Sequence, residues 1–269
     1  MILYDMHMHC NFSSDSKATP ESMIQKAIEC GLKGIYFTDH NDYDYPPENG
    51  KVMFHLDFER YIEKLLKLKA QYHNIINIYL GVEQGLSVTS SDIINAFDSD
   101  RTLDFIIGSS HLVDGADPYY PDFWEKRSTK DAITSYFESI ISQIKACNNY
   151  DVYGHLDYVV RYAPDKDNSY NWEDYKELID NILTSLITQG KGIEINTSSL
   201  TKGLHSTNPC SGIIRRYKEL GGEIITIGSD AHCPANIASE FDKAKDILTD
   251  AGFKYYTHFI ERTPHFIKL

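Results

Sequence analysis

The sequence predicts an α/β fold of the (β/α)7 barrel type, because strands and helices alternate along its whole length. Seven short runs rich in apolar and β-branched residues have the length of buried strands. Helical patterns separate these runs, which is typical of parallel strands linked by crossover helices. Polar side chains follow the runs, where barrel active sites lie. The predicted strands cover residues 2–4, 34–37, 76–82, 105–107, 152–153, 192–195 and 224–227.

Between the predicted strands, apolar residues recur three and four positions apart, as in helices with one buried face. These segments cover residues 20–30, 58–72, 133–145, 175–187, 211–220 and 236–251. Glycines near their ends are expected to terminate the helices: Gly31, Gly190, Gly221 and Gly252. Polar stretches downstream of strands are expected to form loops around the active site: 41–51, 113–129 and 163–172.

Length and composition favour one domain over residues 1–269, because barrels of about 200 to 250 residues commonly have one core. No apolar run approaches the roughly 20 residues of a membrane span. The N-terminal segment has no basic region and only a short apolar run, which argues against a signal peptide. We therefore expect a cytoplasmic protein with no membrane partner.

Charge and cysteine usage restrict the possible partners. A net charge of −13 disfavours nucleic acids, whose binding depends on Lys and Arg, whereas a small phosphorylated metabolite can bind beside metal ions. The five cysteines form an odd set without C-x-x-C spacing, so we interpret them as free thiols. Cys10 and Cys233 each follow a candidate ligand and are expected to point away from it, since neighbouring strand residues face opposite sides.

Residues that can bind metals follow six of the seven predicted strands. In chain order, the strand ends carry His7 and His9, Asp39 and His40, Glu83, His111, His155, Asn196, and Asp230 and His232. Because the C-terminal ends of barrel strands meet on one face, these side chains should converge. Convergence of imidazoles and carboxylates without thiolates predicts a site for zinc, iron or manganese.

Spacing and number add detail to this site. His7 and His9 are two residues apart, which places both imidazoles on one face of a strand, and Asp230 with His232 repeats the spacing. The candidates are too many for one ion, so two or three divalent ions are expected. Glu83, central in the chain order, is the natural bridge between two of them.

Each candidate also has a simpler explanation when it is taken alone. An isolated pair of histidines can be hydrogen bonded at a strand edge, and Asp39 can cap a helix. Glu83 can be a surface carboxylate, and His111 or His155 a buried histidine bonded to backbone. Taken together they favour the metal site, because six of the eleven histidines stand at strand ends.

Six segments resemble the PHP (polymerase and histidinol phosphatase) family in the family's order. They are 5–15, 37–40, 81–83, 108–111, 154–162 and 228–232. The segment Gly-His-Leu-Asp-Tyr-Val-Val-Arg-Tyr at 154–162 is similar to the histidinol-phosphatase branch rather than the polymerase-associated one. The resemblance implies a distorted (β/α)7 barrel with a trinuclear metal centre at the C-terminal ends of the strands.

The resemblance also implies how the ligands are shared. One ion is expected at His7, His9, Glu83 and Asp230. A second is expected at Glu83, His111 and His155. A third is expected at Asp15, His40 and His232. Some members have histidine where this chain has Asp15, a difference that bears on the identity of the third metal. Asp39 is expected to orient a ligand from outside the ligand set.

The activity implied by the resemblance is hydrolysis of a phosphate monoester, with histidinol phosphate as the substrate. Metal ions would provide a bound hydroxide and stabilise charge on the phosphoryl group. Arg161 is the expected phosphate-binding side chain, unless it is an exposed loop arginine. Asp230 and His232 are candidates to protonate the leaving group, besides metal-bound water. The expected catalytic residues are Arg161, Asp230 and His232.

Recognition of the rest of the substrate is expected from the loops. Some histidinol phosphatases carry arginine where this chain has Ser198, and Lys202 and His205 are the nearest cations after it. The expected substrate-binding residues are Arg161, Tyr162, Asn196, Lys202 and His205. Candidates for an acidic rim that faces the substrate's ammonium group are Asp114, Asp117, Asp122 and Asp157.

Three other functions are compatible with the same metal ligands. A nuclease would need a basic track or a stacking surface, against which the net charge of −13 argues. A phosphoesterase for another small phosphate, such as a nucleotide or a sugar phosphate, would differ only in its loops. A metal-storing or metal-sensing domain is disfavoured by the long loops expected over the site.

Overall fold

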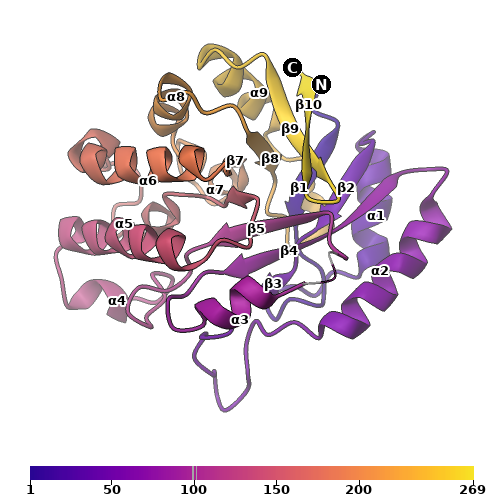
Figure 1. Cartoon of the computed structure of the whole chain (residues 1–269), viewed down its shortest axis with the longest axis horizontal. Coiled ribbons are helices and arrows are strands. Elements are labelled where there is room, and N and C mark those ends of the chain that lie inside the picture. Colours follow the sequence, from indigo (N-terminus) through magenta and orange to yellow (C-terminus); the bar gives the residue numbers. More distant parts are fainter. Residues whose placement is uncertain (99, 101) are drawn as a thin grey trace.

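A curved parallel sheet forms the centre of the molecule (Figure 1). The structure is a computed structural model that describes residues 1–98, 100 and 102–269. Within this part, seven strands are paired in the order β1-β2-β4-β5-β6-β7-β8, and the two-residue β3 pairs with β4. The strands are β1 (Tyr4–Met8), β2 (Gly34–Phe37), β3 (His40–Asn41), β4 (Asn77–Gly85), β5 (Phe105–Ser109), β6 (Val152–Tyr153), β7 (Gly192–Asn196) and β8 (Ile225–Gly228).

The sheet nearly closes between its first and last strands. Met8 and Ala231 form a parallel bridge. The backbone N–H of Asp230 donates to the carbonyl of His7 at 2.7 Å, and that of His9 donates to the carbonyl of Ala231 at 2.9 Å. These bonds involve residues that follow the C-terminal end of β8. The first and last strands therefore join only at that end of the barrel. The predicted distorted (β/α)7 barrel is confirmed.

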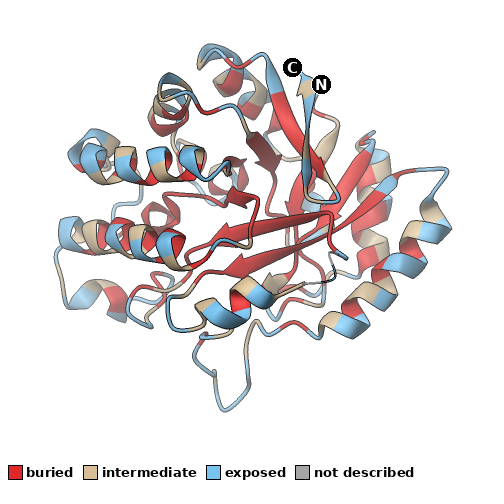
Figure 2. Ribbon diagram, viewed as in Figure 1, coloured by how far each residue is buried: buried red, intermediate tan, exposed pale blue. Residues whose placement is uncertain are grey.

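Helices cover the outside of this sheet. Figure 2 shows strands of the central sheet that are buried over most of their length and helices with one buried and one exposed face. The α-helices are α1 (Pro20–Glu29), α2 (Phe58–Tyr72), α3 (Ser91–Ala96), α4 (Asp122–Glu125), α5 (Thr129–Ala146), α6 (Lys176–Thr188), α7 (Ser198–Thr201), α8 (Ser211–Glu219) and α9 (Phe241–Asp250). The 3-10 helices are η1 (Tyr158–Tyr162), η2 (Trp172–Tyr175) and η3 (Pro234–Asn236). The four glycines predicted to end helices all have positive φ.

A C-terminal hairpin was not expected from the sequence. Strands β9 (Tyr255–Ile260) and β10 (Thr263–Lys268) pair antiparallel. Phe259 joins a buried cluster with Met6, Tyr36 and Phe105 inside the barrel. The Tyr36 hydroxyl donates to the carbonyl of Phe259 at 2.6 Å. The hairpin therefore packs against the barrel interior at the end where β1 and β2 begin, opposite the end where the polar residues converge.

A helix that spans a membrane must be both long and apolar. Within the described ranges, none of the helices has both the length and the apolar character that such a span requires.

Candidate metal centre

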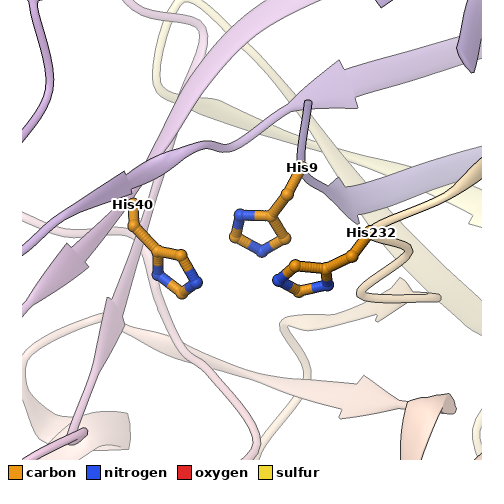
Figure 3. A group of neighbouring side chains, drawn as sticks. All are labelled: His9, His40 and His232. Carbon is orange, nitrogen blue, oxygen red and sulfur yellow. The ribbon is translucent and has the colours of Figure 1, made fainter. Parts of the chain in front are cut away.

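The nine predicted metal ligands come together at the C-terminal ends of the strands. Each has a side-chain nitrogen or oxygen within 3.4 Å of that of another member. They are His7, His9, Asp15, His40, Glu83, His111, His155, Asp230 and His232. Figure 3 shows three of them, His9, His40 and His232, with rings that approach one another from separate parts of the chain.

The local backbone places these side chains in two different ways. His7 lies in β1, and the Nε2 atoms of His7 and His9 are 3.1 Å apart, so this pair faces one side as predicted. Strand β8 ends at Gly228, and Asp230 has a φ of +50°. Asp230 and His232 therefore do not share an extended strand, and that part of the prediction was wrong. Their side chains still meet, with 3.5 Å between Oδ1 of Asp230 and Nδ1 of His232.

The first group consists of His7, His9, Asp230 and atom Oε2 of Glu83. Oε2 of Glu83 lies 3.2 Å from Nε2 of His7 and 3.4 Å from Nε2 of His9. Oδ1 of Asp230 lies 3.4 Å from Nε2 of His9 and 3.9 Å from Nε2 of His7. Ligand atoms at about 2.1 Å around a tetrahedral ion stand about 3.4 Å apart. The first group therefore has the spacing of a tetrahedral transition-metal site.

The second group consists of His111, His155 and atom Oε1 of Glu83. Oε1 lies 3.2 Å from Nε2 of His111 and 2.8 Å from Nε2 of His155. The other oxygen of the same carboxylate belongs to the first group. One oxygen toward each of two groups is the arrangement of a bridging ligand.

The third group consists of Asp15, His40 and His232. Oδ2 of Asp15 lies 3.0 Å from Nε2 of His232 and 3.7 Å from Nε2 of His40. The rings of His40 and His232 each stack on His9 with centroids 4.2 Å apart (Figure 3). Burial opposes the charge of Asp15, but His40 and His232 hold its pKa well below its ordinary value. Asp15 is thus kept as a carboxylate beside two imidazoles.

Unpaired buried atoms show that these groups fit cations. Oε2 of Glu83 and Nδ1 of His40 have no hydrogen-bond partner of good geometry among the described residues, although they lie 3.0 Å apart. Buried polar atoms in proteins are nearly always paired. Instead, Oε2 is enclosed by imidazole nitrogens of His7, His9 and His40 at 3.0 to 3.4 Å. A metal ion between these atoms would satisfy the carboxylate and the imidazoles together.

The pKa values of Glu83 and His9 suit metal ligands. Neighbouring carboxylates, by contrast, outweigh burial and raise the pKa values of His7, His40 and His111, where a metal would displace a proton. Burial opposes the charge of Glu83, but His7 and His40 hold its pKa well below the ordinary value. Burial, together with His232 and His40, lowers the pKa of His9 well below its ordinary value. A carboxylate and a neutral imidazole are the forms that bind divalent metals.

Two ligand histidines are oriented by buried carboxylates. Nδ1 of His7 donates to Oε1 of Glu194 at 2.7 Å. Nδ1 of His111 donates to Oδ1 of Asp42 at 2.8 Å. Such outer contacts select the tautomer that presents Nε2 to a metal.

A third histidine is oriented through a serine. Nδ1 of His9 contacts the hydroxyl of Ser13 at 3.1 Å, and that hydroxyl donates to Oδ1 of Asp39 at 2.7 Å. Asp39 thus lies one contact outside the ligand set. Sγ of Cys10 donates to Asp39 at 3.1 Å and Cys233 is exposed, so neither thiol belongs to the three groups.

Arg161 lies in η1 and is buried beside the first group. Its Nη1 donates to Oδ2 of Asp230 at 3.1 Å. Its Nη2 donates to Asn196 at 3.3 Å, and its Nε donates to Asn208 at 3.3 Å. These bonds fix the plane of the guanidinium. The alternative of an exposed loop arginine is therefore wrong.

A pocket of about 760 Å³ opens over the three groups, and Arg161 and Lys202 line it. Its aromatic lining residues are Tyr45, Phe54, Tyr119, Tyr120, Tyr158 and Tyr162. Asn196, by contrast, reaches this region through its bond to Arg161. The structure does not bring His205 to the pocket, because its side chain is 79% exposed and contacts Asp167 at 3.2 Å.

Comparison with known proteins identifies the family. Residues 5–198, most of the chain, match the family model described as the PHP domain. The chain belongs to the PHP family.

Two relatives narrow the position within the PHP family. A histidinol-phosphatase of Lactococcus lactis is 31% identical over 93% of this chain and 91% of the relative. A protein of Clostridium acetobutylicum named a probable histidinol-phosphatase is 30% identical over 94% of this chain and 95% of the relative. The predicted resemblance to the histidinol-phosphatase branch of the PHP family is confirmed.

A solved structure of a histidinol phosphatase has the same fold as this chain. The crystal structure of histidinol phosphate phosphatase from Lactococcus lactis, complexed with zinc, L-histidinol and phosphate, superimposes with a TM-score of 0.87. It is 29% identical, and the match covers 97% of this chain and 98% of that protein.

Sequence reasoning missed Glu194 and Asp42 in this PHP chain. Glu194 interrupts the apolar strand Gly192–Asn196, and a charged residue inside a buried strand was the available signal. Asp42 follows His40 by two residues, but its partner His111 is far away in the sequence. No spacing rule connects these two residues to their histidines.

Proposed function

We propose that this PHP protein is a metal-dependent phosphomonoesterase that hydrolyses histidinol phosphate to histidinol and phosphate. The observation that carries this proposal is the carboxylate of Glu83, with one oxygen in each of two groups of imidazoles. Both relatives named above and the superimposed Lactococcus structure support the choice of substrate.

In this proposal the nine converging side chains hold two or three divalent ions, of zinc, iron or manganese. The first, second and third groups would each hold one ion, with Glu83 shared between the first two. Bound ions would act as Lewis acids, activating water and neutralising charge on the phosphoryl group. The imidazole and carboxylate donor set supports transition metals over magnesium or calcium.

Arg161 is proposed to bind the phosphate. A guanidinium carries five N–H groups, and three bonds hold this one against Asp230, Asn196 and Asn208. Two N–H groups remain for phosphate oxygens. Lys202 also lines the pocket and would provide a second positive charge, which Ser198 does not.

Asp230 and His232 are proposed to handle the proton that the leaving alkoxide needs. Both line the same pocket as Arg161, and their facing atoms are 3.5 Å apart. Nδ1 of His232 also contacts the backbone carbonyl of Asp230 at 3.0 Å, and Nη1 of Arg161 donates to the other carboxylate oxygen, Oδ2, at 3.1 Å.

The aromatic lining is proposed to bind the histidinol part. Tyr158 and Tyr162 contact each other with ring centroids 5.1 Å apart, beside His155 of the second group. Of the four acidic candidates for the rim, Asp117 lines this pocket, where it accepts from the Tyr45 hydroxyl at 2.8 Å. The imidazole of histidinol would pack against the tyrosines, and its ammonium group would lie near the carboxylate of Asp117.

We also propose that residues 1–269 form one domain.

A steady-state screen tests the proposed substrate. Purified protein is assayed with histidinol phosphate, a simple alkyl phosphate, a nucleotide and a sugar phosphate. We expect kcat/KM for histidinol phosphate to exceed that of each alternative by at least about tenfold, because only this substrate uses the pocket lining. A ratio near one would overturn the substrate while leaving metal-dependent phosphate hydrolysis in place.

A further inference from the structure

Glu194 joins parts of the site that are far apart in the sequence. Its side chain is 1% exposed in the middle of β7. Oε1 accepts from Nδ1 of His7 at 2.7 Å. Oε2 accepts from the backbone N–H of His155 at 2.9 Å and from Nδ2 of Asn196 at 3.1 Å. One carboxylate thus receives donors from the first group, the second group and the residue that holds Arg161.

These contacts set the geometry of two ligand histidines. A carboxylate only accepts, so Nδ1 of His7 must carry the hydrogen and Nε2 must present its lone pair. His155 has a φ of +23°, which is unfavourable for a residue other than glycine. The bond from its N–H to Glu194 stabilises that backbone, and its Nε2 lies 2.8 Å from Glu83.

The neighbouring backbone leaves room for this arrangement. A Cβ atom at Gly228 would lie 2.3 Å from Oε1 of Glu194 and 2.4 Å from Cβ of His7. Only glycine allows β8 to pass so close to both residues. The short bond between Glu194 and His7 therefore depends on packing as well as on charge.

We propose that Glu194 is a positioning residue that couples the first and second groups, so that one substitution weakens metal binding at both. The inference rests on the metal centre of the proposed function. The third group should respond least, because none of the hydrogen bonds of Glu194 reaches Asp15, His40 or His232 within the described chain.

Glu194→Gln isolates the hydrogen-bond chemistry, because glutamine has the same shape. The single side-chain oxygen of glutamine must accept the two hydrogen bonds that Oε2 of Glu194 receives from His155 and Asn196. The amide NH2 then faces Nδ1 of His7 and forces that ring to accept. His7 would adopt the tautomer with hydrogen on Nε2 and could no longer offer that atom to a metal.

Glu194→Asp is the companion variant. It keeps a carboxylate that only accepts, but it is shorter and leaves a cavity. A positioning role through hydrogen bonds predicts that metal affinity falls in the order wild type, Glu194→Asp, Glu194→Gln. A role in packing alone predicts the opposite order for the two variants, since glutamine fills the space and aspartate does not.

Metal affinity is measured by competition between the protein and a chelator for Zn²⁺, with bound metal counted by elemental analysis. We expect Glu194→Gln to lower the affinity of the protein for two ions by about 10- to 100-fold and for a third ion by less. Asp151→Asn is the control, because Asp151 is also buried and accepts from the backbone N–H of Ile106 at 2.8 Å and from Nε of Arg262 at 2.6 Å, at the start of β6 and away from the three groups. Circular dichroism verifies that each variant is folded.

Three results would overturn the inference. The first is an unchanged metal affinity in Glu194→Gln, and the second is an equal loss of metal affinity in Asp151→Asn. The third is a higher metal affinity in Glu194→Gln than in Glu194→Asp. None of these results depends on the substrate. Failure of the proposed function would instead appear in the wild type, as absence of hydrolysis of histidinol phosphate or as binding of no more than one ion.

Discussion

The two ends of the barrel use buried polar groups differently. At the end near the hairpin, the carboxylate of Asp104 accepts from the backbone N–H groups of Leu80 at 3.0 Å and Glu261 at 3.2 Å. At the other end, Oε2 of Glu83 and Nδ1 of His40 have no hydrogen-bond partner of good geometry among the described residues. The first arrangement is complete without a ligand, whereas the second leaves buried polar atoms that a cation would pair.

This difference separates stability from chemistry along the same strands. The hairpin end is filled by aromatic side chains, including Tyr36, Phe105 and Phe259, that pack against each other. The opposite end carries histidines and carboxylates under an open pocket. Substitutions at the hairpin end should therefore lower stability and leave activity unchanged. Substitutions at the pocket end should lower activity.

The largest expected effect is at Glu83. Glu83→Gln removes the charge that both the first and the second group share, so we expect metal content and turnover to fall together, with activity below about a tenth of wild type. Glu63→Gln, an exposed glutamate of α2, is the control. Elemental analysis and steady-state kinetics are the measurements, and a variant that keeps its activity would show that Glu83 is not a bridge.

The hairpin end is tested by Phe259→Ala. Phe259 is 3% exposed and stacks on Phe105 with centroids 5.1 Å apart, so its removal should lower the free energy of unfolding by about 3 to 5 kcal/mol. Activity of the folded protein and its metal content should stay at wild-type values. Phe266→Ala on the same hairpin is the matched control, because Phe266 is 51% exposed. Equal unfolding curves for the two variants would refute the role of the hairpin as part of the core.

A smaller effect is expected at Arg161. If its guanidinium binds the phosphate, Arg161→Ala should lower kcat/KM by at least about tenfold, because charge-assisted hydrogen bonds contribute roughly 1.5 to 3 kcal/mol. Metal content should not change. Arg215→Ala, which removes an exposed arginine of α8, serves as the control. Loss of metal in Arg161→Ala would mean that the residue supports Asp230 rather than the substrate.

The parallel strands could be predicted because each has an apolar run, but their C-terminal limits could not. Strand β4 extends to Gly85, past the predicted end at residue 82, and β1 extends to Met8. The polar residues at these ends are buried in the site, so an apolar pattern does not reveal them as strand residues. The hairpin was missed because it is antiparallel and lies outside the alternation of strands and helices.

The candidate ligands could be predicted because the fold brings strand ends together regardless of their distance in the sequence. The residues that orient them could not be assigned this way. Glu194 acts on His7 across 187 positions, and its role depends on the direction of one side chain inside the barrel. Asp230 shows the opposite case, because this predicted ligand reaches the site from a backbone with positive φ instead of from the predicted strand.

The number of metal ions tests the central claim most directly. Protein purified without chelator is analysed for zinc, iron and manganese, and the total is compared with turnover of histidinol phosphate in the same sample. Three groups of ligand atoms, two of which share the carboxylate of Glu83, predict two to three equivalents of transition metal per chain in the active protein. One equivalent or less at full activity would contradict the multinuclear centre.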